Sequence, residues 1–386
     1  MNIQKLRQSV NYLTLAISLA AGLTTVSSCS AEPVDTAYSI EENDTSQAYQ
    51  LGLNYYKGNS VKQDYKEAFE LFQEAANQGD PQAQFQLGVM YEDGESVSED
   101  KVEALKWYKK AAEQGLADAQ NKMGVKYFYS EDVERNYGKA IKWFRKAADQ
   151  GHPEAQFHLG EYYTNIEGSP IDYNQAIKWY RKSAEQGFYP AEFNLAALYY
   201  KGIDTEPNYS EAFKWYKKVA DKGHAPAQFQ VAIMYYDGLG VEQDYGKAFE
   251  LFQTLEHEGY PSAQHNLGVM YEKGEGVEQD YKIAAQWYQK AADQGYSLSQ
   301  NDLGSLYYSG RGVKEDYDKA FDLYTKAAAQ GEALAQFNLG EMYYYGDSVS
   351  QDYNKAYEWY IKAATQGNQM AQERINKLKN EGKITR

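Results

Sequence analysis

A period of 36 residues runs through most of this 386-residue chain. Glycines recur at that spacing without one missing: Gly79, Gly115, Gly151, Gly187, Gly223, Gly259, Gly295, Gly331 and Gly367. An alanine column that begins at Ala68 and a tyrosine column that begins at Tyr55 keep the same register. A fixed period of this length is typical of arrays in which each repeat stacks on the next and buries a shared core. We therefore expect nine repeats in unbroken register.

Each period predicts two helices. In the first, Ala83, Leu87, Met90 and Tyr91 are spaced at i, i+4, i+7 and i+8, which places them on one helical face. Asp or Asn precedes the second helix in every repeat, where a short acceptor can cap free backbone N–H groups. This column consists of Asp64, Asp100, Asn136, Asp172, Asn208, Asp244, Asp280, Asp316 and Asp352. A glycine closes each helix in most repeats, as is common at helix C-termini.

The aromatic residues follow the same period. All six tryptophans share one column, in which the other three repeats have Leu: Trp107, Trp143, Trp179, Trp215, Trp287 and Trp359. A row of aromatic rings can form a ladder for a sugar or another ligand, but replacement by Leu without loss of register favours a repeated core position. Most of the 38 tyrosines also fall in a few columns, and we interpret them as packing positions.

The complete pattern is A-x-x-x-L-G-x-x-Y-x-x-G-x-G-V-x-x-D-Y-x-K-A-x-x-W-Y-x-K-A-A-x-Q-G, and residues 263–295 contain it almost whole. It resembles the Sel1-like repeat, a close relative of the tetratricopeptide repeat. That resemblance implies an all-α fold, a right-handed α-solenoid of nine 36-residue helix-turn-helix repeats over residues 46–369. We expect residues 370–386 to form a C-terminal capping helix. The family binds proteins or peptides and organises complexes, so the resemblance implies a protein partner and no cofactor.

The N-terminus predicts export and lipid attachment. Two basic residues precede a short apolar stretch (residues 11–23), which is typical of a secretory signal. The sequence from Val26 to Cys29 resembles the bacterial lipobox, which implies a signal peptide over residues 1–28 and a lipid on Cys29. The alternative is an ordinary signal with an incidental cysteine. Residues 29–45 are polar and predict a flexible tether. In bacteria with two membranes, a residue other than Asp after the lipidated cysteine usually implies sorting to the outer membrane, and here that residue is Ser30. The protein could then face the periplasm or the cell exterior.

Charge and cysteine content exclude several kinds of partner and site. The net charge of −16 disfavours nucleic acid and direct adsorption to anionic lipid, so we expect contact with a membrane only through the lipid anchor. A single cysteine permits no internal disulfide and no cysteine-based zinc site. The five histidines share no column and form no zinc motif, so we predict no metal site.

One short motif suggests an enzyme. Ser98 and Lys101 match the S-x-x-K motif of β-lactamases and penicillin-binding proteins. The accompanying S-D-N and K-T-G motifs do not occur in the sequence, and Asp100 occupies the N-cap column. A β-lactam-interacting enzyme is therefore the less favoured alternative, and we predict no catalytic residues.

Binding specificity is expected on the first helices, which usually line the concave side of a helical-repeat array. One column there is polar in every repeat, and it could bind a partner or simply be solvated. Its members are Gln50, Gln86, Lys122, His158, Asn194, Gln230, Asn266, Asp302 and Asn338. The sequence thus predicts a lipid-anchored envelope scaffold that binds a protein or peptide there. A surface-displayed receptor or virulence factor for a host protein is the alternative.

Overall fold

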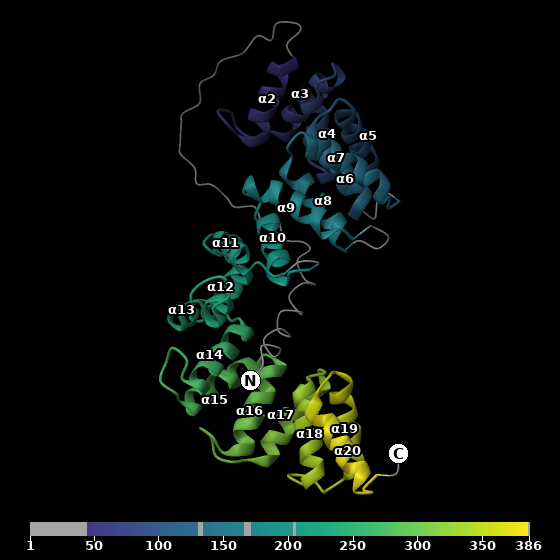
Figure 1. Ribbon diagram of the computed structural model, residues 1–386. Coiled ribbons are helices and arrows are strands. Elements are labelled where there is room, and N and C mark those ends of the chain that lie inside the picture. The colour runs from purple at the N-terminus through teal and green to yellow at the C-terminus, as the bar shows by residue number, and fades with distance from the viewer. Residues whose placement is uncertain (1–44, 130–133, 166–170, 204–205, 385–386) are drawn as a thin grey trace. The chain divides into compact units, whose positions relative to one another are not determined.

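The computed structural model describes residues 45–129, 134–165, 171–203 and 206–384. These residues form nineteen helices and no strand. They belong to two compact units, an N-terminal unit up to residue 208 and a C-terminal unit from Tyr209 (Figure 1).

The N-terminal unit contains α2 (Thr45–Lys57), α3 (Tyr65–Asn77), α4 (Pro81–Asp93), α5 (Lys101–Glu113), α6 (Ala117–Tyr129), α7 (Tyr137–Asp149), α8 (Pro153–Asn165), α9 (Tyr173–Glu185) and α10 (Tyr189–Lys201). The C-terminal unit contains α11 (Tyr209–Ala220), α12 (Ala225–Asp237), α13 (Tyr245–His257), α14 (Pro261–Lys273), α15 (Tyr281–Asp293), α16 (Ser297–Ser309), α17 (Tyr317–Ala329), α18 (Ala333–Tyr345), α19 (Tyr353–Thr365) and α20 (Gln369–Asn380).

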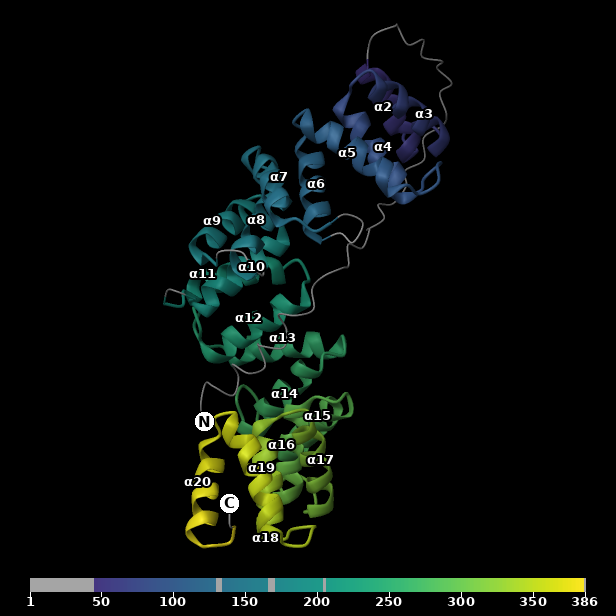
Figure 2. The same cartoon turned by 90° about the vertical axis from the view of Figure 1, so that its right-hand side faces the viewer.

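Within each unit, every helix packs against the helix before it and the helix after it (Figures 1 and 2). The even-numbered helices are the first helices of the repeats, and the odd-numbered helices are the second. Helix α20 adds a tenth first helix, as predicted for the C-terminal cap. The predicted all-α solenoid of nine helix pairs is confirmed.

Capping explains why the second helices begin where they do. Asp64 accepts hydrogen bonds from the backbone N–H groups of Lys66 and Glu67 at 3.0 and 3.2 Å. The same side-chain cap occurs at Asp100, Asn136, Asp172, Asp244, Asp280, Asp316 and Asp352. Each such cap contributes about 1 kcal/mol, so the predicted column defines the start of these helices.

The glycines of the 36-residue column lie just beyond the ends of the second helices; Gly79, for example, follows the C-cap Gln78 of α3. Gly79 adopts a φ of 100°, a left-handed conformation that is strained for residues with a side chain. Its N–H donates to the carbonyl of Ala76 at 3.1 Å, and the N–H of Asp80 donates to that of Ala75 at 3.0 Å. These bonds satisfy carbonyls at the helix end and turn the chain into the next repeat.

The core lies between the first and second helices of each repeat. A Cβ atom at Gly88 would lie 2.5 Å from the ring of Tyr108, so the glycine permits the close approach of α4 and α5. Tyr108, Tyr180, Tyr288 and Tyr360 are fully buried at one position of the repeat, which confirms that this tyrosine column is a packing column.

The tryptophan column also belongs to the core. Trp107, Trp179 and Trp215 are buried, and the remaining tryptophans are partly buried. A lysine three residues later lies over each ring; Lys110 Nζ, for example, is 3.7 Å from the ring centroid of Trp107. The rings are therefore enclosed by core on one side and by a lysine on the other, and they are not arranged as a ligand ladder.

Candidate binding face

The predicted polar column lies on the first helices, but it is more buried than a simple solvated row would be. His158, Gln230 and Asn266 are buried, and Gln86, Lys122, Asn194, Asp302 and Asn338 are partly buried. Only Gln50 of α2 is exposed among the nine. The column therefore lies at the edge of the contact between successive first helices, with part of its surface open to a partner.

Most of these side chains already have partners within the chain. Asn266 donates to the carbonyl of Ser262 at 2.8 Å, and Asn338 donates to Asn301 Oδ1 at 2.9 Å. Asn194 donates to the hydroxyl of Tyr180 at 3.4 Å. Asn194 and Asn338 thus link neighbouring repeats, whereas the bond of Asn266 lies within α14. Whether the column also binds a partner stays a prediction.

Seven residues beyond this column, the first helices present a second and more open one. Tyr129 at the end of α6 and Tyr345 at the end of α18 are 45% and 51% exposed. Lys57 and Ser309 in the same column are exposed as well. These tips are the parts of the first-helix face that a macromolecule could contact without rearrangement.

One cluster of charges joins α4 and α6 at the polar column. Lys122 Nζ lies 2.8 Å and Lys126 Nζ 2.5 Å from the carboxylate of Glu92, which also accepts a hydrogen bond from Tyr108 at 2.6 Å. Burial raises the pKa of Glu92, but hydrogen bonds from Lys122, Lys126 and Tyr108 outweigh it and lower the pKa to about 2. Lys126 is 8% exposed at a position where α4 has Met90. The ion pair with Glu92 stabilises the lysine at this buried position.

A second cluster joins α6 and α8. His158 Nδ1 lies 2.9 Å from Glu161 Oε2, and Tyr129 donates its hydroxyl proton to the same oxygen at 2.6 Å. On its other side, His158 Nε2 lies 3.6 Å from Glu154 Oε1. Burial lowers the pKa of His158, but the two glutamates outweigh this effect, and the net shift is upward.

A third cluster joins α18 and α20. Arg374 donates from Nε and Nη2 to the two carboxylate oxygens of Glu341 at 2.8 and 2.5 Å. Tyr360 also donates to Glu341, and Arg374 donates to the hydroxyl of Tyr345 at 3.1 Å. This two-bond geometry fixes the capping helix to the array more rigidly than a single contact would.

The sequence reasoning missed a ladder of glutamines. Gln114 donates to Gln84 Oε1 at 2.8 Å, and Gln84 donates to the carbonyl of Ala76 at 3.1 Å. The same link between glutamines thirty residues apart joins Gln150 to Gln120, Gln186 to Gln156, Gln294 to Gln264, Gln330 to Gln300 and Gln366 to Gln336. Two recurrent glutamine columns were visible in the sequence and could have indicated it.

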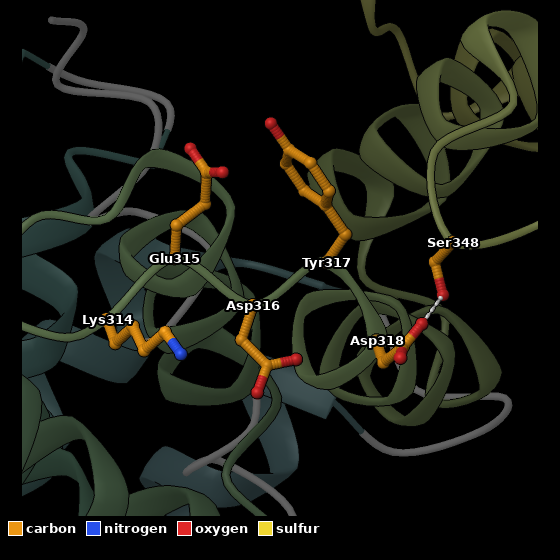
Figure 3. Close-up of a pocket in the computed structure, with 6 residues that line it drawn as sticks. All are labelled: Lys314, Glu315, Asp316, Tyr317, Asp318 and Ser348. Carbon is orange, nitrogen blue, oxygen red and sulfur yellow. Dashed lines mark hydrogen bonds between the residues drawn. The ribbon is translucent and has the colours of Figure 1, made fainter.

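A shallow polar hollow of about 390 Å³ lies in the C-terminal unit. Figure 3 shows the six residues that line it. Its residues have structural roles: Asp316 caps α17, and Asp318 accepts a hydrogen bond from Ser348 at 2.5 Å. Within the described ranges, no group of three or more His, Cys, Asp or Glu side chains is placed to hold a metal ion.

The S-x-x-K motif is part of an exposed turn. Ser98 is exposed before α5, Asp100 caps that helix, and Lys101 Nζ lies 3.7 Å from Glu99. A nucleophilic serine would need a nearby base and oxyanion donors, whereas this lysine is paired with a neighbouring acid.

The predicted signal peptide, Cys29 and most of the tether lie outside the described residues. None of the helices in the described part of the chain is long and apolar enough to cross a membrane.

The stacked helix pairs and the first-helix face define a helical-repeat protein. The Sel1 repeat family matches nine consecutive segments: residues 48–80, 81–116, 117–152, 153–188, 190–224, 225–255, 261–296, 297–332 and 333–368. The chain belongs to the Sel1 repeat family, whose members generally mediate protein–protein interactions.

Two solved structures are similar over nearly the whole chain. A protective antigen present in uropathogenic Escherichia coli strains, which displays an SLR fold, is 32% identical with a TM-score of 0.68, and the match covers 99% of this chain and 83% of that one. A Sel1 repeat protein from Oxalobacter formigenes is 31% identical with a TM-score of 0.63, and the match covers 90% of this chain and 98% of that one. No curated relative matches the sequence.

Proposed function

We propose that this protein is a lipid-anchored scaffold of the bacterial envelope, which binds a protein or peptide on the face formed by its first helices. The observation that carries the proposal is the first-helix face itself, where a column of partly buried polar groups lies beside a more exposed column that includes two tyrosines. These tyrosines, Tyr129 and Tyr345, are 45% and 51% exposed. Tyrosines that combine apolar area with a hydroxyl are favoured at protein interfaces.

The family supports binding as the activity, since Sel1 repeat proteins generally mediate protein–protein interactions. Among the buried polar side chains of the first helices, Lys126 joins two repeats through its contact with Glu92. An array of this kind presents a long surface whose specificity depends on side chains that differ between repeats.

The location rests on the N-terminal sequence. A lipid on Cys29, followed by a polar tether, would hold the array near a membrane without a transmembrane helix. Ser30 favours the outer membrane in bacteria that have one. Replacement of Cys29 by Ala should move the protein from the membrane fraction to the soluble fraction, and continued membrane association would refute the lipid anchor.

A second candidate function is display on the cell surface to bind a host protein. It is favoured by the 32% identity to a protective antigen of uropathogenic Escherichia coli, since an antigen that elicits protection is accessible to antibodies. Protease treatment of intact cells distinguishes the two, because a surface-displayed array is cleaved whereas an array inside the envelope is protected.

Site-specific photocrosslinking tests the binding face. A benzophenone amino acid at Tyr129 or Tyr345 should capture a partner in intact cells. The matched control is Val102 on the second helix α5, which is 67% exposed and lies off the first-helix face. Equal capture from Val102, or capture from Val102 alone, would refute the proposed face.

A further inference from the structure

Two first-helix junctions, one in each unit, are built from the same kinds of side chain. In the C-terminal unit, Tyr345, Glu341 and Arg374 meet between α18 and α20. In the N-terminal unit, Tyr129, Glu161 and His158 meet between α6 and α8. His158 and Arg374 occupy the same column of the repeat. The ion pair of Arg374 crosses from α20 to Glu341 on α18, whereas the two glutamates that face His158 lie on its own helix. The junctions also differ in whether the cation can lose its charge. Arginine keeps its proton throughout the physiological range, and histidine does not.

The hydrogen bonds of His158 assign one of its protons. Tyr129 donates its own proton to Glu161, so the tyrosine oxygen and the carboxylate can only accept from His158 Nδ1 at 3.3 and 2.9 Å. Nδ1 must therefore carry a proton. In the neutral ring, Nε2 then presents a lone pair toward Glu154 Oε1 at 3.6 Å. That nitrogen is fully buried and has no hydrogen-bond partner in the structure.

A second histidine, His152, acts on Glu154 and lies 3.1 Å from Asp118 of α6. On α7, Phe144 stacks on the imidazole with centroids 4.7 Å apart, and on α6 Phe128 lies 6.5 Å away. On α8 itself, the charged groups that face His158 are Glu154 and Glu161. On α9, the uncharged hydroxyl of Tyr180 lies near Glu161 and accepts a hydrogen bond from Asn194 of α10. Aromatic faces and carboxylates both favour a cation at this position.

We propose that His158 is a pH-sensitive lock of the junction between α6 and α8. Glu154 and Glu161 lie on the same helix as His158, and they contact α6 by accepting hydrogen bonds from Asn121 at 3.0 Å and from Tyr129 at 2.6 Å. The doubly protonated ring holds both carboxylates in these positions, with Nδ1–H donating to Glu161 and Nε2–H facing Glu154, and the junction loosens when Nε2 loses its proton. Loss of the second proton leaves two carboxylates beside a neutral ring and an unsatisfied buried nitrogen. The junction matters structurally because α6 and α8, although they are not consecutive, approach each other directly.

The direction of the pH dependence follows from linkage. Burial alone would lower the pKa of His158, but the pairing with Glu154 and Glu161 raises it above its ordinary value near 6.5. The stabilisation is therefore complete below about pH 6.5 and is lost as pH rises through the folded-state pKa. Loosening of the junction between α6 and α8 would alter the first-helix face on which we place partner binding. The pH dependence itself does not require a bound partner.

An NMR titration of the full chain labelled at histidine Cε1 tests the lock directly. His158→Gln identifies the His158 resonance, and it is a conservative choice since Gln86 and Gln230 occupy the same column in other repeats. We expect the His158 midpoint to lie above its ordinary value of 6.5. A midpoint for His158 at or below 6.5 would overturn the proposal.

Hydrogen exchange of α8, measured by mass spectrometry and corrected for intrinsic exchange rates, gives a second readout. For each unit by which the folded pKa exceeds 6.5, the open population of α8 should rise about tenfold between low and high pH. The difference should vanish in His158→Gln. Helix α20, joined by Arg374, should show no such change between pH 5.5 and 8. A pH-independent α8 in the parent protein, or the same pH dependence in His158→Gln, would contradict the lock.

Discussion

The clusters around Glu161 and Glu341 show how one position of a repeat can serve two purposes. Both carboxylates lie between successive first helices, and both contact a tyrosine hydroxyl and a cation from the polar column. At α20 the cation is Arg374, which donates two parallel hydrogen bonds to Glu341 and keeps its charge throughout the physiological pH range. At α8 the cation is His158, whose charge depends on pH and whose two glutamates lie on its own helix. The two junctions therefore differ in the ionisation of the cation and in whether its ion pair crosses between helices.

The largest loss of stability is expected from breaking the ion pair between Arg374 of α20 and Glu341 of α18. Arg374→Gln leaves Glu341, whose side chain is 18% exposed, without its cation. Loss of one partner of a fully buried pair costs 3–5 kcal/mol, and we expect about 2 kcal/mol here because both side chains keep some contact with solvent. The measurement is hydrogen exchange of α18 and α20. An unchanged exchange rate in α20 would show that Ile375 and Leu378 alone hold the cap.

A smaller effect should appear at Glu92 in acid. The folded pKa of about 2 lies below the ordinary value of 4.5, so the stabilisation is present above about pH 4.5 and is lost as pH falls toward 2. We expect Glu92→Gln to remove this acid-dependent part of the stability of α4 and α6. Exchange of those helices between pH 5 and 2.5 measures it.

Glu272 provides the matched control for Glu92, since it occupies the same column in α14. It also accepts a hydrogen bond from a tyrosine, Tyr288 at 2.7 Å, but its nearest cation among the ion pairs is Arg311 at 3.8 Å. Glu272→Gln should therefore change the acid dependence of its own unit less. An equal change in both variants would mean that Lys122 and Lys126 do not stabilise the Glu92 carboxylate.

Transfer of the titratable side chain sharpens the comparison further. Arg374→His should make exchange in α20 pH-dependent, with protection at pH 5.5 that weakens toward pH 8, because a histidine beside Glu341 is stabilised only while it is protonated. Arg374→Lys, which keeps its charge, is the control. If both variants show the same pH profile, the comparison between the two junctions fails.

The sequence predicted those features that depend on local spacing. The register, the Asp and Asn caps, the tryptophan column and the extra helix at the end all follow from the 36-residue period. Burial in the polar column could not be predicted in this way, because it depends on how closely successive first helices approach. Lys126 was nevertheless visible as a lysine in a methionine column, and its partner Glu92, 34 residues earlier, becomes evident only when α4 and α6 are stacked.

The smallest effect concerns the lysines that cover the tryptophans. Lys110 Nζ lies 3.7 Å from the ring centroid of Trp107 in the N-terminal unit, whereas Lys218 Nζ lies 5.0 Å from Trp215 in the C-terminal unit. Lys110→Met should cost about 0.5 kcal/mol, the usual contribution of an exposed cation–π contact, and Lys218→Met should cost less.

Lys326 is the control for the lysine substitutions, because its repeat has Leu323 in place of a ring in the tryptophan column. Where Leu71 and Leu251 replace tryptophan, the lysine is also replaced, by Glu74 and Thr254, as expected if the ring is one reason for the cation. Denaturant unfolding of Lys110→Met, Trp107→Leu and the double variant measures the coupling. Because Trp107→Leu removes the ring, Lys110→Met should cost nothing further in that background, and a full additional cost there would mean that the lysine acts by covering core surface and not through the indole.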